Sequence, residues 1–301
     1  MLISPGNPKV SVCMISYNHG KYIAQAIESI LAQEADFSFE LVIGDDFSRD
    51  DTVSICESFA ERDLRVRLLE RQPNMGVMLN FTRTLAACKG QYIAVCEGDD
   101  YWTDPRKLAK QVDFLDRNLD YAGAAHQSEV LINDCCVRKF KTGIPTTLNE
   151  EDLIGGRLFH TASILFRRSV VDLFCQAPQV LSCDRLLNFL IAFTGKIYFC
   201  NQSMCVYRIH GGGMSSNVTV SQLKLDLGCI DYLKSLRPTF PSCQYRSYVY
   251  ATIGLCTLAT PVQKIGYLTL SIIYSFANFP YNLYDYSMYL FRAAKRRMLR
   301  G

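Results

Sequence analysis

Residues 92–100 read YIAVCEGDD, a run of uncharged residues followed at once by a cluster of acids. The uncharged run is typical of a buried strand, and the glycine among the carboxylates indicates a turn at its end. Glu97, Asp99 and Asp100 supply the oxygen ligands that hard divalent cations prefer, and such cations are commonly shared with substrate phosphates. This acidic turn is therefore a candidate site for Mn²⁺ or Mg²⁺.

The same acids also have a structural interpretation, in which a solvated turn caps the next helix. That interpretation has little need of Asp99 or Asp100. Asp104 is a good N-cap residue and Pro105 suits the first position of a helix. The cation site is the hypothesis that these residues favour.

On both sides of this turn, short apolar runs alternate with stretches that have the helical period. The apolar runs cover residues 10–15, 39–43, 66–69, 92–95 and 121–125, and the helical stretches cover residues 22–32, 52–62, 77–88 and 105–118. This alternation predicts an α/β fold with a mostly parallel, Rossmann-like sheet flanked by helices. Ligands of such sheets bind at the carboxyl ends of the strands.

Two further strand ends carry candidate residues. Ser16 and Tyr17 follow the first strand, and Asp45 and Asp46 follow the second. A turn stabilised by an Asp side chain explains part of the second cluster but leaves Asp46 unexplained. The functional hypothesis is that Asp46 accepts a hydrogen bond from a nucleobase while Tyr17 stacks on it.

The chain has neither of the common glycine loops that hold phosphates. G-x-G-x-x-G after the first strand is missing, and so is G-x-x-x-x-G-K-[ST]. This argues against a dinucleotide dehydrogenase and against a P-loop NTPase. A nucleotide bound here needs its diphosphate neutralised in another way, and the acidic turn with a cation provides one.

Composition narrows the class of protein further. The 301 residues are 49% hydrophobic and 20% charged, which excludes a largely disordered chain. A net charge of +3 gives no reason to expect nucleic acid as a partner. The 13 cysteines show no C-x-x-C spacing, and no secretory leader is evident, so we expect a reducing, cytoplasmic location.

Beyond residue 131 the pattern is mixed. We expect a strand at 162–166, a helix after Asp184, a strand pair near 196–207, and helices from 218 onward. Residues 265–291 contain one charged residue, Asp285, and a basic end follows them. This C-terminal segment is compatible with helices that lie on a membrane surface, namely the inner face of the cell membrane. A helical cap on the catalytic part and an oligomer interface are the alternatives.

Three segments together resemble the family-2 glycosyltransferases, and the resemblance covers roughly residues 9–215. The segments are residues 10–18, residues 45–52 and residues 97–100, each placed after the corresponding strand. The resemblance implies the GT-A fold and an inverting transfer from a nucleotide-sugar.

The resemblance also implies roles for individual residues. The expected nucleotide-binding residues are Ser16, Tyr17, Asp46, Asn74, Gly76 and Asp99; the expected metal ligands are Asp99, Asp100 and His210; the expected catalytic base is Asp184. Two positions depart from the family pattern, since Glu97 is the first acid of the D-x-D motif and Cys183 precedes the proposed base.

Several of these residues have ordinary structural alternatives. Asp184 also fits a plain N-cap, and His210 a loop histidine with a local hydrogen bond. Trp102 either stacks on a sugar or packs in the core. Arg208 pairs with phosphate or forms a surface ion pair, and His160 shapes an acceptor pocket or lies at a strand edge.

The sequence as a whole predicts a catalytic domain at residues 1–215 and a helical C-terminal region at 216–301. The predicted function is an inverting glycosyltransferase that uses Mn²⁺ or Mg²⁺ and a nucleoside-diphosphate sugar, with a UDP-sugar favoured. The expected acceptor is a glycan or lipid-linked glycan of a bacterial surface polysaccharide. The alternatives are a nucleotide-sugar binding module without turnover and a sugar-phosphate nucleotidyltransferase.

Overall fold

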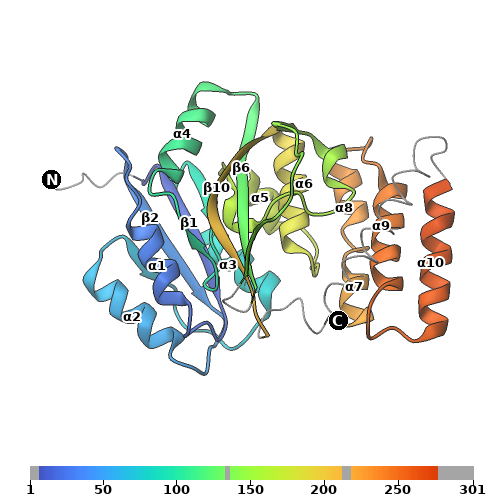
Figure 1. The fold of residues 1–301 in the computed structure, drawn as a ribbon, viewed down its shortest axis with the longest axis horizontal. Helices are drawn as coiled ribbons and strands as arrows, with labels where there is room; N and C mark the ends of the chain where they lie inside the picture. The colour runs from blue at the N-terminus through green and yellow to red at the C-terminus, as the bar shows by residue number, and fades with distance from the viewer. Residues whose placement is uncertain (1–6, 133–135, 212–217, 277–301) are drawn as a thin grey trace. The chain divides into compact units, whose positions relative to one another are not determined.

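A computed structural model describes residues 7–132, 136–211 and 218–276 of the chain (Figure 1). The chain divides into two compact units. The first unit comprises residues 1–149, 157–176 and 183–211. The second comprises residues 150–156, 177–182 and 212–301.

A mixed β-sheet forms the centre of the first unit. Its described strands are β1 Val10–Ser16, β2 Phe39–Asp45, β3 Val66–Leu68, β4 Tyr92–Val95, β5 Tyr101–Trp102, β6 Tyr121–Ile132, β7 Cys136–Lys139, β8 Thr147–Leu148, β9 Leu165–Arg167 and β10 Lys196–Ile209. The strand order is β3-β2-β1-β4-β9-β6-β10-β5, with β7 beside β6 and β8 beside β10. Strands β3, β2, β1 and β4 are parallel, and so are β6 and β10.

Helices cover both faces of this sheet. Those of the first unit are α1 Ile23–Leu31, α2 Thr52–Arg62, α3 Val77–Ala87, α4 Lys107–Arg117, α5 Val170–Cys175 and α6 Cys183–Thr194. Helices α1, α2 and α4 share one apolar core with Val12 and Met14 of β1, whereas α3 packs against α5, and α5 against α6. Successive side chains of a strand point to opposite faces of the sheet, so a fully buried strand packs against the helices on both faces.

The α/β fold predicted from the alternation is confirmed, and most element bounds agree within two residues. The predicted strand pair near 196–207 is wrong, because β10 is one strand of 14 residues. Its pairing with β6 shifts register around Ser203, where the sequence Asn201–Ser203 is polar and interrupts the apolar run. Strand β9 is antiparallel to both neighbours, so the sheet is less parallel than expected.

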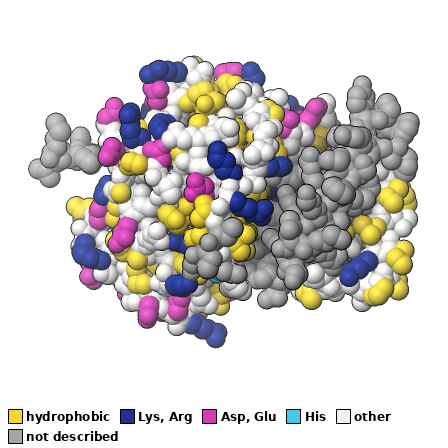
Figure 2. Space-filling model, viewed as in Figure 1, with side chains coloured by type: hydrophobic (Ala, Val, Ile, Leu, Met, Phe, Trp, Pro, Cys, Tyr) yellow, Lys and Arg dark blue, Asp and Glu magenta, His cyan; other side chains and the backbone are white. Residues whose placement is uncertain are grey.

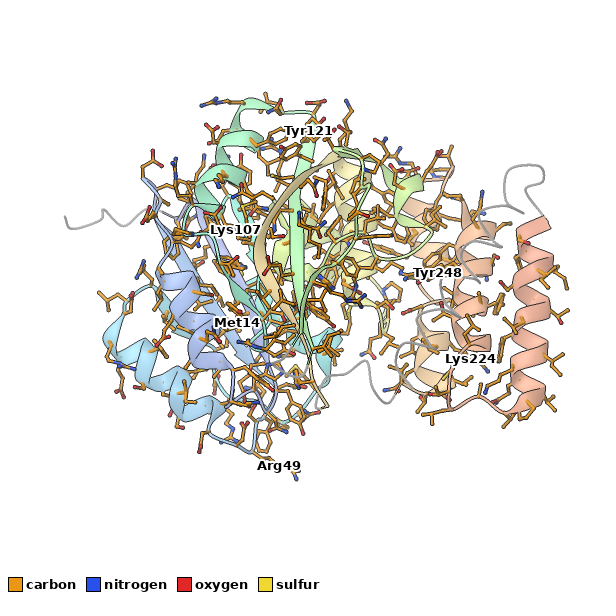
Figure 3. All side chains as sticks on the ribbon, in the orientation of Figure 1. Met14, Arg49, Lys107, Tyr121, Lys224 and Tyr248 are labelled. Carbon is orange, nitrogen blue, oxygen red and sulfur yellow. The ribbon has the colours of Figure 1, made fainter. Side chains whose placement is uncertain are left out.

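Trp102 belongs to the core and not to a sugar site. Its ring is 4% exposed, and its Nε1 donates to the carbonyl of Ala162 at 2.9 Å. Lys107, labelled in Figure 3, is completely buried. Its Nζ lies 3.9 Å from the centre of the Trp102 ring and 2.8 Å from Gln111 Oε1. Burial lowers the pKa of Lys107 to about 8.

The second unit is helical where it is described. It contains η1 Glu150–Leu153, α7 Val220–Leu225, α8 Ile230–Leu236, α9 Ser242–Gly254 and α10 Pro261–Phe276. Helices α9 and α10 are joined by reciprocal bonds, since Ser247 Oγ donates to the Ser271 carbonyl at 2.8 Å and Ser271 Oγ to the Ser247 carbonyl at 2.7 Å. Among the described residues, no helix has the length and apolar character needed to cross a bilayer. The basic end of the chain lies outside the described residues.

Surface charge is mixed, in keeping with the small net charge. On the face shown in Figure 2, lysine and arginine side chains are interspersed with aspartate and glutamate. Coulomb attraction to a polyanion such as nucleic acid needs a basic stripe, and this face carries none over its described residues.

Candidate active site

The ends of β1, β2 and β4 are tied together by backbone hydrogen bonds. Asp46 N donates to the Ser16 carbonyl at 2.9 Å, and Gly98 N donates to the Ile15 carbonyl at 3.0 Å. Parallel strands end at the same edge of a sheet, so the three predicted motifs meet there as expected.

The loops after β1 and β2 support one another. Asn18 N donates to Ser48 Oγ at 2.8 Å, and Arg49 N donates to Asn18 Oδ1 at 2.9 Å. Asp45 accepts from both the backbone N, at 2.8 Å, and the hydroxyl of Ser48. Asp45, and not Asp46, therefore stabilises the turn after β2.

Asp46 is the anchor of the loop that precedes α3. Its Oδ1 accepts from Met75 N at 2.8 Å and its Oδ2 from Gly76 N at 3.0 Å. Asn74 Nδ2 donates to the Asp46 carbonyl at 2.8 Å, and Gly76 has a φ of 84°, which favours glycine. The structure thus brings Asp46, Asn74 and Gly76 together. Each carboxylate oxygen retains lone-pair capacity for a ligand, so base recognition by Asp46 stays a prediction.

Two aromatic side chains are exposed at this edge. Tyr17 is 45% exposed and Phe47 is 38% exposed, and both follow strand ends. Arg71 lies with its guanidinium 4.4 Å from the centre of the Phe47 ring, and its Nη2 donates to the Ser48 carbonyl at 2.9 Å. Sequence reasoning missed Phe47 and Arg71. An aromatic residue directly after the Asp45-Asp46 pair was the available signal.

Asp99 contacts two histidines. Its Oδ2 lies 3.1 Å from His210 Nε2 and 3.7 Å from His19 Nε2. Burial raises the pKa of Asp99, but the hydrogen bond with His210 and the proximity of His19 outweigh it, and the net shift is downward. The predicted pairing of Asp99 with His210 is present, and His19 is an additional neighbour that the sequence analysis did not select.

Asp100 faces the protein interior instead. It is 1% exposed, its Oδ1 accepts from Arg208 N at 2.9 Å, and its Oδ2 has no partner among the described residues. Burial, with Asp99 and Glu97 nearby, holds the pKa of Asp100 well above its usual range. The structure thus pairs Asp99 with His210 and Asp100 with the backbone of Arg208, and the metal set of Asp99, Asp100 and His210 stays a prediction.

The donor set fits a cation shared with substrate better than a cage made of protein ligands. Across residues 7–132, 136–211 and 218–276, no three His, Cys, Asp or Glu side chains are placed to hold a metal ion. Asp99 and His210 together offer one carboxylate and one imidazole. Mg²⁺ in particular is usually bound by one or two protein carboxylates together with substrate phosphates. The pair satisfies that minimum.

Arg208 does not form a surface ion pair, and its pairing with phosphate stays a prediction. It is 7% exposed, and its guanidinium lies 5.0 Å from the centre of the Tyr22 ring and 4.5 Å from that of Tyr101. Its Nη1 donates to the Asp99 carbonyl at 2.6 Å and its Nη2 to Gln25 Oε1. Arg208 is thus a buried cation that holds the backbone of the acidic turn.

Asp184 lies in the first turn of α6 and forms an ion pair. Its Oδ2 is 2.6 Å from Nη2 of Arg157, a residue that the sequence analysis did not select. Burial raises the pKa of Asp184, but Arg157 and Arg185 outweigh it and the net shift is downward. The charges of Asp99, Arg157 and Asp184 all affect the pKa of Glu97. The ion pair therefore lies close enough to the acidic turn to interact with it electrostatically.

Stacked rings support Arg157. The ring centres of Phe140 and His160 are 4.0 Å apart, and those of His160 and Tyr207 are also 4.0 Å apart, the latter pair nearly parallel at 8°. The Arg157 guanidinium is 5.9 Å from the centre of the Tyr207 ring. His160 is 2% exposed, and burial together with Arg157 lowers its pKa well below the usual range. His160 is therefore a buried ring of this stack.

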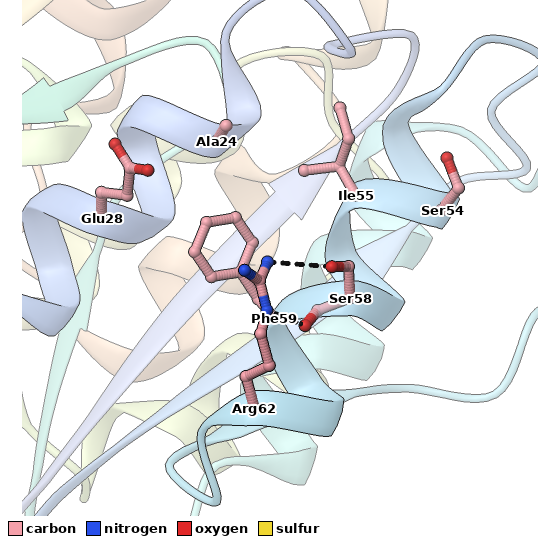
Figure 4. Close-up of a pocket in the computed structure, with 7 residues that line it drawn as sticks. All are labelled: Ala24, Glu28, Ser54, Ile55, Ser58, Phe59 and Arg62. Atoms are coloured by element: carbon pink, nitrogen blue, oxygen red, sulfur yellow. Dashed lines mark hydrogen bonds between the residues drawn. The ribbon is translucent and has the colours of Figure 1, made fainter.

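A shallow pocket of about 340 Å³ lies elsewhere on the first unit, between α1 and α2 (Figure 4). It is lined by Ala24, Glu28, Ser54, Ile55, Ser58, Phe59 and Arg62. Arg62 is bound to Ser58 through Nε to the carbonyl at 2.7 Å and Nη2 to Oγ at 2.8 Å. None of the predicted site residues lines this pocket, so it adds nothing to the candidate site.

Comparison with known proteins gives a family and a fold. A family model described as glycosyl transferase family 2 matches residues 11–173, which is more than half of the chain. An uncharacterized protein of Mycobacterium tuberculosis is 36% identical over 68% of this chain, and the match spans 60% of that protein. A Bacillus subtilis protein, provisionally named a teichuronic acid biosynthesis glycosyltransferase, is 26% identical over 70% of this chain and 82% of its own length.

Two solved structures share the fold at low sequence identity. Staphylococcus aureus TarS 1–349 in complex with UDP-GlcNAc has a TM-score of 0.59 at 16% identity, covering 90% of this chain and 93% of TarS. Mannosyltransferase PcManGT of Pyrobaculum calidifontis, in complex with GDP-Man and Mn²⁺, has a TM-score of 0.58 at 17% identity, covering 98% of this chain and 88% of that one. The expected GT-A type α/β architecture with a helical C-terminal region is confirmed.

The buried acid Glu97 gives a test of the site's electrostatics. Burial and the neighbouring Asp99 raise the pKa of Glu97 from 4.5 to about 7. Between these values the folded protein holds a proton that the unfolded chain has lost, so stability falls as the pH rises from about 4.5 to 7. Glu97→Gln removes this loss. We expect its free energy of unfolding to exceed that of wild type by about 1–3 kcal/mol at pH 8, with little difference at pH 5.

Urea unfolding at the two pH values measures this difference. Glu28→Gln, on the exposed side of α1, is the control and should follow wild type. If the free energy of unfolding of Glu97→Gln differs from that of wild type by the same amount at pH 5 and pH 8, Glu97 does not titrate as a buried carboxyl.

Proposed function

The chain belongs to glycosyl transferase family 2, and from this premise we propose that it is an inverting glycosyltransferase. It would move a sugar from a nucleoside-diphosphate donor to a hydroxyl group of an acceptor. The observation that carries the proposal is the meeting of Asp99 with His210 at the end of β4. Both Asp99 and Asp184 raise the pKa of Glu97, which supports assigning the cation ligand and the base to one site.

The donor's base and diphosphate bind at the ends of β1, β2 and β4 in this proposal. The half-exposed ring of Tyr17 offers a stacking face for the base, near Ser16 and the loop held by Asp46. The complexes of TarS with UDP-GlcNAc and of PcManGT with GDP-Man support a nucleotide-sugar donor. We propose a UDP-sugar.

Asp99 and His210 are the residues that would hold Mn²⁺ or Mg²⁺. When bound, the cation would stabilise the negative charge of the departing diphosphate. Asp100 has a positioning role, because its Oδ1 accepts from the backbone of Arg208 on β10 and so joins the acidic turn to the strand that ends just before His210.

Asp184 is the proposed base. It accepts the proton of the acceptor hydroxyl while the hydroxyl oxygen bonds to the anomeric carbon from the side opposite the diphosphate. The bond between the anomeric carbon and the diphosphate oxygen breaks, and its electron pair leaves with the diphosphate. Attack from the opposite side inverts the configuration, and no nucleophilic Ser or Cys is needed.

The acceptor in this proposal is a glycan or lipid-linked glycan of a bacterial surface polysaccharide. The provisional name of the Bacillus subtilis relative supports this class. Free thiols at the described cysteines fit a reducing, cytoplasmic location. We also propose that residues 1–215 carry catalysis and that the region 216–301 contacts the inner face of the membrane.

The first test concerns the base. Asp184→Asn keeps the shape of the side chain but cannot accept the proton at neutral pH, so we expect sugar transfer to fall about 10²–10⁴-fold. Binding of UDP, measured by calorimetry, should stay within about threefold of wild type. Asp113→Asn, on the exposed side of α4, is the matched control. Transfer at the wild-type rate in Asp184→Asn would remove Asp184 from the mechanism.

The second test concerns the cation. Mn²⁺ with UDP should raise the thermal midpoint of wild type, since a ligand at 100 times its Kd stabilises the folded state by about 2.7 kcal/mol. Asp99→Asn should lose the Mn²⁺-dependent part of the shift, because it removes the carboxylate of the pair. The Asp113→Asn control should keep it. If Mn²⁺ raises the thermal midpoint of Asp99→Asn as much as that of wild type, Asp99 is not a ligand of the cation.

The third test concerns the membrane. Val262, Ile265 and Ile273 of α10 are 80%, 69% and 56% exposed, and the sequence beyond residue 291 is basic. We expect sedimentation with vesicles containing phosphatidylglycerol and little with pure phosphatidylcholine. Ile265→Ser with Ile273→Ser should weaken binding, whereas Leu64→Ser, fully exposed in the first unit, should not. Absence of binding to both vesicles overturns the membrane proposal.

A further inference from the structure

The ion pair between Arg157 and Asp184 conflicts with the task proposed for Asp184. A carboxylate 2.6 Å from a guanidinium is stabilised in its charged form and accepts a proton poorly. A general base works best when its pKa lies near the working pH. Asp184 would therefore be a stronger base if another anion engaged Arg157.

Arg157 is built to receive such an anion. Its side chain is 39% exposed, so a ligand can reach it, and the Tyr207 ring, stacked on the buried His160, lies 5.9 Å from its guanidinium. A guanidinium presents several N–H donors in one plane, which match a carboxylate or phosphate in two-pronged fashion. Lys141 Nζ donates to the Arg157 carbonyl at 3.4 Å, which places a second cation close by.

We propose that Arg157 is a receptor for a carboxylate or phosphate of the substrate, which takes the guanidinium from Asp184 and frees Asp184 to accept the proton. This proposal rests on the proposed function for the role of Asp184. Its new content is the substrate class, since it requires a negatively charged group within reach of the attacking hydroxyl or of the transferred sugar.

The direction of the electrostatic effect follows from the groups that face the pair. Arg157 and Arg185 lower the pKa of Asp184, and Glu97 is the acidic neighbour of both members. Tyr207 and His160 face Arg157 from the stack. Moving Arg157 to a substrate anion removes the largest stabilisation of the Asp184 carboxylate, so the pKa of Asp184 rises and its strength as a base increases.

The anion can come from the acceptor or from the donor sugar, and paired probes distinguish the two. The acceptor arm compares D-glucuronate with D-glucose and glycerol 3-phosphate with glycerol. The donor arm compares UDP-glucuronate with UDP-glucose. Each pair differs chiefly in one anionic group. Dissociation constants are measured on the full chain at constant ionic strength, by calorimetry or by ligand-observed NMR, and no turnover is needed.

Wild type should bind the anionic member of at least one pair about tenfold more tightly than its neutral partner. Arg157→Gln should reduce that ratio to below about two, and Arg157→Lys should retain part of it. Arg117→Gln, which also removes an arginine from an ion pair with an aspartate, is the matched control and should behave as wild type. A wild-type ratio near one in both arms overturns the proposal, as does an unchanged ratio in Arg157→Gln.

Asp184→Asn provides an opposite prediction. It removes the carboxylate that competes for Arg157, so anion binding should tighten about threefold or more. The double variant Arg157→Gln with Asp184→Asn should lose that gain. A gain that persists without Arg157 means that general charge, and not competition for the guanidinium, is responsible, and it overturns the proposal.

Folding and the proposed function are checked separately. Far-UV circular dichroism and the thermal midpoint establish whether Arg157→Gln is folded, and Arg157→Lys decides the question if it is not. Binding of UDP with Mn²⁺ reports on the donor site. If wild type does not bind UDP with Mn²⁺, the proposed function is refuted. If wild type binds UDP but does not prefer the anionic probes to their neutral partners, only the role of Arg157 is refuted.

Discussion

Crowding of negative charge at the end of β4 is the constraint on which the site depends. Glu97, Asp99 and Asp100 lie on one turn, and burial together with the neighbouring acids opposes the ionisation of Glu97 and Asp100. Arg208 of β10 compensates for this by binding the turn through its backbone N and its guanidinium, and His210, directly after β10, binds Asp99. Strand β10 therefore contributes to holding the acidic turn, together with the bond from Gly98 N to the Ile15 carbonyl.

The same balance of charge extends to the proposed base. Arg157 neutralises Asp184 at the edge of the acidic cluster, and its guanidinium lies 5.9 Å from the ring of Tyr207, which stacks on the buried His160. Arg208 donates to the backbone carbonyl of Asp99, and Arg157 pairs with the carboxylate of Asp184, so one arginine serves the acidic turn and another the proposed base. The two arginines differ in exposure, because Arg208 is buried between two tyrosine rings while Arg157 remains within reach of a ligand.

Local sequence predicted the first unit well and the later segments less well. Helix α2 was predicted at its observed bounds from its helical period. The length of β10 was missed, since the polar residues at 201–203 break the apolar pattern while its pairing with β6 continues across them. Asp46, Asn74 and Gly76 were expected together and are together, but that the Asp46 carboxylate binds the loop itself depends on contacts about 30 residues apart.

The sequence by itself determined the α/β fold, the family and the acids at two strand ends, because hydrophobic period and motif spacing are local properties that survive without coordinates. Tertiary structure alone decided which groups surround those acids. His19 and His210, Arg208 and Arg157 reach the carboxylates from separate segments of the chain. A charged group's neighbours are set by folding, and neighbours, more than residue type, decide whether a carboxylate binds a cation, a proton or a guanidinium.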